Sequence, residues 1–207
     1  YNIRIQKIRG AAMTTPIAQE KGHEPYTYAD YLSWDTLDRY ELIDGEAVLL
    51  AAPTTSHQLA SAELMRQLAN FLDGKKCKAI PAPFDVRLFE TNEDAPENVN
   101  TVVQPDITVI CDQSKLDERG YKGAPEMVIE IISPSSLRHD RLVKFNLYQR
   151  AGVGEVWLVD PASCSVQVFL LEDGILLLHE VYTRKDIAKV NSLAGCFIEV
   201  GKIFSQE

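Results

Sequence analysis

The sequence lacks the patterns that would place it in a membrane, metal-finger or secreted class. It has no uninterrupted apolar run of about 18 residues, so we expect no transmembrane helix and no membrane partner. Its beginning lacks the apolar stretch of a secretory signal. The four cysteines, Cys77, Cys111, Cys164 and Cys196, form no Cys-x-x-Cys pair, which argues against zinc. We therefore predict four reduced thiols in a cytoplasmic protein.

Basic residues are too few for a protein that binds nucleic acid over a wide surface. The chain has 21 Lys and Arg against 30 Asp and Glu, a net charge of −9. Non-specific binding to nucleic acid depends on many phosphate contacts, so this balance counts against it. The charge remains compatible with an enzyme that has a local basic patch and carboxylates for a metal ion.

The length of 207 residues suits one domain preceded by a short arm. We assign residues 1–25 to the arm and residues 26–207 to the domain. Met13 is a plausible start, so residues 1–12 are interpreted as partly non-native sequence and play no part in the functional argument.

Hydrophobic periodicity and turn residues predict a mixed α/β core flanked by helices, with an N-terminal β-hairpin. Asp44-Gly45 favours a tight turn with positive φ, Ser56 is the expected cap of a helix ending near Leu72, and Gly152 ends a later helix. We expect a first helix within 26–40, the hairpin over 40–43 and 46–51, strands over 76–80, 84–89, 102–111, 126–132 and 155–159, a helix over 137–151, and a late hairpin over 166–171 and 175–183.

Two carboxylates lie in apolar strands, where they are costly to desolvate unless they are paired or bind a metal. Asp106 opens the apolar run at 106–111, and Glu130 lies inside the run at 127–132. On adjacent strands the two could bind one magnesium ion, which takes few protein oxygens and leaves positions for water and phosphate. The alternative is structural, with Asp106 at the surface and Glu130 paired with an arginine.

The helix after Glu130 adds a cation on a defined face. Asp140, Lys144 and Tyr148 are four residues apart and therefore share one face. A lysine beside a phosphate can stabilise developing negative charge or orient the attacking water. The alternative is a solvated helix with a surface pair between Asp140 and Lys144. The segment is locally basic, with one acid against Arg138, Arg141, Lys144 and Arg150.

An ordered series of segments resembles the Uma-type family of restriction-endonuclease-like proteins, part of the PD-(D/E)XK nuclease superfamily. The resemblance covers about residues 26–200. It rests on YELIDGE (40–46), PTTSH (53–57), PFDVRL (83–88), QPDITVICD (104–112), GAPEMVIEIISPSS (123–136), DRLVKFNLYQRAGV (140–153) and EVWLVDP (155–161).

The resemblance implies a restriction-endonuclease-like fold with Asp106 and Glu130 as metal-binding carboxylates. The usual motif has lysine two residues after the glutamate, where this chain has Ile132. The family pattern offers Lys144 from the following helix instead. Glu41 matches a family position in the early hairpin and is our third metal-binding acid, the alternative being a surface charge on that hairpin.

Several polar residues have two interpretations. His57 matches a family position and is a candidate base or phosphate contact, although capping the helix together with Ser56 is slightly favoured. Asp85 faces either the site or solvent, and Gln104 and Tyr148 are candidate supporting groups around the site.

Together these observations predict a magnesium- or manganese-dependent endonuclease that hydrolyses DNA, with Asp106, Glu130, Lys144, Glu41 and His57 in its site. Cutting both strands favours a homodimer. Three alternatives stay open: a nuclease-fold binding protein without activity, a hydrolase of RNA or another phosphodiester, and an interaction protein that binds no metal.

Overall fold

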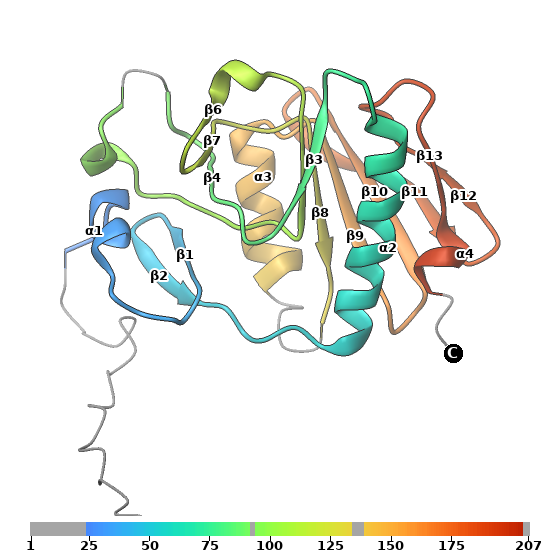
Figure 1. Ribbon diagram of the computed structural model, residues 1–207, viewed down its shortest axis with the longest axis horizontal. Helices are drawn as coiled ribbons and strands as arrows, with labels where there is room; N and C mark the ends of the chain where they lie inside the picture. The colour runs from blue at the N-terminus through green and yellow to red at the C-terminus, as the bar shows by residue number, and fades with distance from the viewer. Residues whose placement is uncertain (1–23, 92–93, 134–138, 205–207) are drawn as a thin grey trace, which may run out of the picture.

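A six-stranded mixed sheet is the centre of the protein (Figure 1). The structure is a computed structural model that describes residues 24–91, 94–133 and 139–204. The strand order is β11-β10-β9-β8-β5-β3; β8 and β9 are parallel and all other neighbours are antiparallel. The strands are β3 (Lys78–Pro81), β5 (Ile107–Ile110), β8 (Met127–Ile131), β9 (Glu155–Asp160), β10 (Ser165–Glu172) and β11 (Ile175–Thr183). The predicted mixed α/β core is confirmed.

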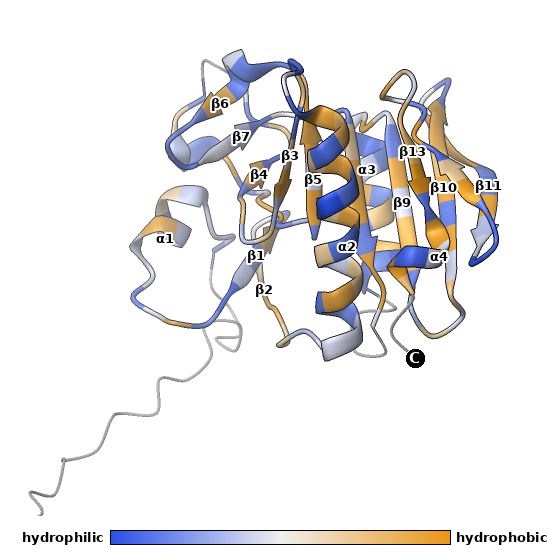
Figure 2. Cartoon of the chain, turned by 45° about the vertical axis from the view of Figure 1, so that its right-hand side comes forward, coloured by the Kyte–Doolittle hydropathy of each residue, from blue (hydrophilic) through white to orange (hydrophobic). Residues whose placement is uncertain are grey.

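Helices cover both faces of this sheet (Figure 2). Alternation along β8 sends Ile129 towards α2 (Thr55–Leu72) and Val128 towards α3 (Phe145–Ala151). The apolar stripe of α2 is buried against the first face, beside the short helix α4 (Val200–Ile203). Each buried leucine of this stripe contributes about 1.5–3 kcal/mol. The stripe comprises Ala60, Leu64, Leu68 and Leu72.

The predicted N-terminal hairpin is present as β1 (Tyr40–Ile43) and β2 (Glu46–Leu49). Both turn residues have positive φ, 49° at Asp44 and 83° at Gly45, as the Asp-Gly pair predicts. An isolated bridge from Leu42 to Val102 attaches β1 to the segment before β5. The bridge places the buried strand β1 beside the segment that contains Asp106 and leads into β5.

Smaller elements complete the described chain. They are α1 (Tyr28–Ser33), the 3-10 turns η2 (Pro96–Asn98) and η3 (Gln113–Lys115), a sheet of β4 (Val86–Arg87), β6 (Leu116–Asp117) and β7 (Gly120–Lys122), and the pair β12 (Ile187–Lys189) and β13 (Phe197–Glu199). No helix within the described ranges is long and apolar enough to cross a membrane. Most of the predicted arm, residues 1–23, lies outside those ranges.

Several predicted elements differ from those observed. The strand expected over 84–89 is reduced to β4, which pairs with β7 outside the central sheet. The strand expected over 102–111 is shorter in the structure: β5 begins at Ile107, because Val102 and Val103 form isolated bridges to other segments. The helix expected over 137–151 begins, within the described residues, as a π-helical turn, η4 (His139–Lys144), and continues as α3. Residues 137 and 138 lie outside the described ranges. Gly152, with φ 86°, ends α3 as predicted.

The prediction of four reduced thiols is wrong, because Cys77 and Cys111 form a disulfide. Lys78 pairs with Ile110 in the β3–β5 ladder, and one further step of that register places the two cysteines opposite each other. Cys164 and Cys196 are free thiols. The two cysteines are 34 residues apart in the sequence, so the sequence alone did not indicate the disulfide. The pairing of β3 with β5 brings them together.

Candidate active site

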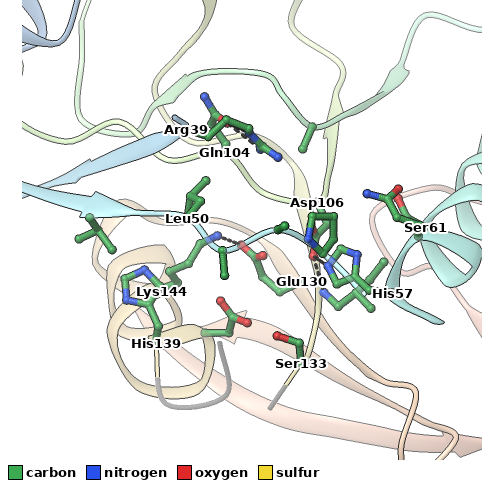
Figure 3. Close-up of a pocket in the computed structure, with 18 of the residues that line it drawn as sticks. Arg39, Leu50, His57, Ser61, Gln104, Asp106, Glu130, Ser133, His139 and Lys144 are labelled. Carbon is green, nitrogen blue, oxygen red and sulfur yellow. Dashed lines mark hydrogen bonds and ion pairs between the residues drawn. The ribbon is translucent and has the colours of Figure 1, made fainter. Parts of the chain in front are cut away.

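A pocket of about 290 Å³ opens where the β1–β2 hairpin, the start of α2 and η4 meet the sheet (Figure 3). The connection from β2 to α2 forms an apolar wall, with Leu50 near the centre of the view. Polar residues from five separate segments line the same space. They are Arg39, His57, Gln58, Ser61, Gln104, Asp106, Glu130, Ser133, His139, Asp140 and Lys144.

Strand pairing brings Asp106 and Glu130 together. Ile107 pairs with Ile129 across β5 and β8, so one further step of this antiparallel register places Asp106 opposite Glu130. Opposed residues point to the same face, here the face covered by α3. Oδ2 of Asp106 accepts a hydrogen bond of 2.7 Å from the backbone N–H of Ile131. The expectation of two carboxylates on adjacent strands therefore matches the geometry.

Lys144 lies between two buried carboxylates. Its Nζ is 2.6 Å from Oε1 of Glu130 and 3.0 Å from Oε1 of Glu41. Tyr148, one turn further along, donates its hydroxyl hydrogen bond to Glu130. The alternative of a solvated Asp140–Lys144 surface pair is wrong, because the exposed fractions of these residues are 5% and 3%.

Ile132, at the position of the usual motif lysine, is buried in the apolar core between the sheet and α3. The position two residues after Glu130, on the same face of the strand, therefore holds an apolar side chain and no charge. The cation beside Glu130 is instead Lys144, from the turn that leads into α3.

The charges of this cluster are strongly coupled. Burial opposes ionisation of Glu41, but Lys144, His139 and the Gln104 amide outweigh it and lower the pKa of Glu41 to about 2. Burial raises the pKa of Glu130 well above its usual range, and the nearby acids Asp140, Asp106 and Glu41 add to this against the influence of Lys144. The cluster thus has more carboxylate than Lys144 alone neutralises.

His57 reaches Asp106 from the first turn of α2. Its Nε2 lies 3.0 Å from Oδ2 of Asp106, and its ring lines the pocket. The slightly favoured capping role with Ser56 is wrong: the cap is Thr54, whose hydroxyl accepts from the backbone N–H of His57. The imidazole is thereby available to the site.

Glu41 lies behind Lys144 rather than on the pocket wall. Its side chain is fully buried, and it accepts hydrogen bonds from the backbone N–H of Gln104 at 2.8 Å and from Lys144. His139 Nε2 is 3.3 Å from its second oxygen. Within the described ranges, no group of three or more His, Cys, Asp or Glu residues is arranged to bind a metal ion. The alternative of a surface charge on the hairpin is wrong for Glu41, because its side chain is buried.

Sequence reasoning did not assign six polar residues of the pocket to the site: Arg39, Gln58, Ser61, Ser133, His139 and Asp140. Asp140 and His139 precede Lys144 in a basic segment, which made solvent exposure the simpler interpretation. Arg39 shows no signal in the sequence, because only its contact with Gln104 brings it to the pocket. Asp85 does not line the pocket and is half-buried; burial raises its pKa while Gln104, Tyr31 and Tyr28 donate hydrogen bonds to it.

Comparison with known proteins agrees with this architecture. The family model described as "Uma2: Putative restriction endonuclease" matches residues 28–201. The uncharacterised protein slr1290 of Synechocystis sp. is 24% identical over 168 residues, 78% of this chain and 84% of that protein. A crystal structure from Anabaena variabilis, titled a "putative nuclease belonging to DUF820", superposes with a TM-score of 0.68. Its sequence is 19% identical, and the match covers 87% of this chain and 98% of that one.

Proposed function

The chain belongs to the Uma2 family of restriction-endonuclease-like proteins, and from this premise we propose that it is a metal-dependent nuclease that hydrolyses DNA phosphodiester bonds. The single observation that supports the proposal is that one pocket contains Asp106, Glu130 and Lys144. Two carboxylates and one cation on a shared surface suit metal-assisted phosphodiester hydrolysis, in which the carboxylates bind the ion and the cation stabilises negative charge.

The donor set fits magnesium or manganese bound by Asp106 and Glu130. Magnesium typically takes one or two protein carboxylates and completes its shell with waters and substrate oxygens. The raised pKa of Glu130 indicates excess carboxylate, which a divalent cation would offset. Bound here, such an ion supplies Lewis acidity towards the phosphate and the attacking water. Glu41 is better placed to orient Lys144 than to bind the ion, because it does not line the pocket.

The surrounding side chains have distinct tasks in this proposal. The Lys144 ammonium has three N–H donors, of which two are directed at Glu130 and Glu41. The third stabilises negative charge on a substrate oxygen or orients the attacking water. His57, bound to Asp106, contacts the phosphate or receives a proton from the water. Tyr148 fixes the rotamer of Glu130.

A nucleic-acid-binding protein without cleavage activity is the second candidate. It is favoured by Lys144, whose ammonium already partly neutralises Glu130 and Glu41 and so reduces the charge available to bind a metal ion. Metal-independent, salt-sensitive binding without any cleavage product would distinguish this candidate from the nuclease.

Cleavage of labelled DNA tests the proposal. Wild type should produce fragments in magnesium or manganese and none in EDTA. Each of Asp106→Asn, Glu130→Gln and Lys144→Met should reduce the rate by about a hundredfold or more, as loss of one charge-stabilising group does. Glu118→Gln is the matched control, because Glu118 is exposed and outside the pocket. Wild-type rates in all three variants would refute the assignment, and RNA fragments alone would shift the substrate to RNA.

A further inference from the structure

Arg39 and Gln104 form a polar pair at one end of the pocket, set apart from Asp106 and Glu130 (Figure 3). Nε and Nη2 of Arg39 donate to Oε1 of Gln104 at 3.0 and 2.7 Å. A guanidinium has five N–H donors, so this contact fixes the plane of the group and leaves three donors for a ligand. Arg39 immediately precedes β1, and its backbone O accepts from Leu50 N, which holds its main chain in place.

The amide of Gln104 is oriented from behind. Its Nε2 donates to Oδ1 of Asp85 at 2.9 Å and to the hydroxyl of Tyr31 at 3.1 Å. A carboxylate only accepts and a guanidinium only donates, so Gln104 must present its nitrogen to Asp85 and its oxygen to Arg39. The direction of Arg39 is therefore set by a chain of buried and half-buried groups rather than by solvent.

The positive charge of Arg39 differs from that of Lys144 in having no carboxylate partner among the described residues. Among the described residues, no carboxylate forms an ion pair with Arg39, whereas Lys144 contacts two. Most other arginines with a side-chain contact in these ranges face an acid, as Arg87 faces Glu90 and Asp117. A rigidly held guanidinium that faces a pocket without its own counter-ion is suited to an external anion.

We propose that Arg39 binds a phosphate of the nucleic-acid strand next to the phosphate that is cleaved, with Gln104 and Asp85 as positioning residues. This inference rests on the proposed function, because it takes the ligand to be a phosphodiester chain that crosses the pocket. A guanidinium fork matches the geometry of phosphate oxygens. DNA and RNA share this chemistry, and the apolar wall near Leu50 lies beside the same path.

Binding, measured without cleavage, tests the subsite. In an Asp106→Asn background, fluorescence anisotropy with labelled DNA and RNA oligonucleotides gives the affinity between about 50 and 200 mM salt. Arg39→Gln should weaken binding by about tenfold or more and reduce the slope of log affinity against log salt by about one. Arg119→Gln removes the same charge from an exposed site outside the pocket and should change neither.

Two further variants separate binding from a structural role. Arg39→Lys keeps the charge and should keep the salt slope, with part of the affinity lost. Gln104→Met frees the guanidinium and should weaken binding less than Arg39→Gln does. The subsite is refuted if Arg39→Gln and Arg119→Gln bind alike, or if neither oligonucleotide binds. Arg39-dependent binding without cleavage in the Asp106-containing protein would refute the nuclease while supporting the subsite.

Discussion

Replacing Lys144 with methionine should destabilise the protein strongly, because the ammonium lies between two buried carboxylates. Glu41 and Glu130 are almost fully buried, and both contact its Nζ. Removing one partner of a buried ion pair costs about 3–5 kcal/mol, since the remaining charge has no compensation. For a domain of this size that loss lowers the melting temperature by about 6–20 °C.

Urea unfolding of Lys144→Met and Lys202→Met provides the measurement and its control. Lys202 is also 2.6 Å from a glutamate oxygen, but that pair with Glu199 is about half exposed. An exposed pair is worth about 0–1 kcal/mol, so the same substitution there should change little. Adding Glu41→Gln to Lys144→Met should cost less than the sum of the single changes, because the two residues share one interaction.

A small effect would refute this reasoning. If Lys144→Met lost no more free energy of unfolding than Lys202→Met, the buried cluster would not depend on its cation. The roles given to Glu41 and Glu130 would then fail with it.

Three further predictions concern the stability and the oligomeric state of the protein. Glu41→Gln should be less stable than wild type above pH 4.5, and this difference should shrink as the pH falls towards 2. The reason is that the lowered pKa of Glu41 stabilises the folded state only while the carboxylate is ionised. Urea unfolding of both proteins across this pH range measures the difference in free energy of unfolding. Gly120→Ala should destabilise by about 1–3 kcal/mol in thermal unfolding, since φ is +139° and a Cβ would lie 2.1 Å from the Asp85 carbonyl oxygen, whereas Gly74→Ala, also at positive φ, meets open space and should cost less. Light scattering should give the mass of a homodimer if two copies cut the two strands of DNA, and a monomer mass at working concentrations would contradict that expectation.

The elements that short-range sequence signals define were predictable. The Asp44-Gly45 turn, the Gly152 helix end and the end of α2 at Leu72 each depend on neighbouring residues, and all three were confirmed. The ends of strands were less predictable. The strand that ends at Ile110 begins only at Ile107, because Val102 and Val103 form bridges to segments far away in the chain.

The site was predictable in part for the same reason. Carboxylates inside apolar strands indicate Asp106 and Glu130, and resemblance adds Lys144. The contacts of Arg39 with Gln104 and of Cys77 with Cys111 depend on how distant segments meet, so no local pattern predicted them. A basic segment with helical spacing looked solvated, yet tertiary packing buries Asp140 and Lys144.

Calorimetric titration with manganese, in the presence of a non-hydrolysable phosphorothioate oligonucleotide, tests the metal centre most directly. Wild type and Glu118→Ala should bind manganese alike, whereas the Asp106→Ala, Glu130→Ala double variant should lose the binding heat. Equal binding by the double variant would place the metal elsewhere. No binding by wild type would contradict a metal-dependent nuclease at this pocket.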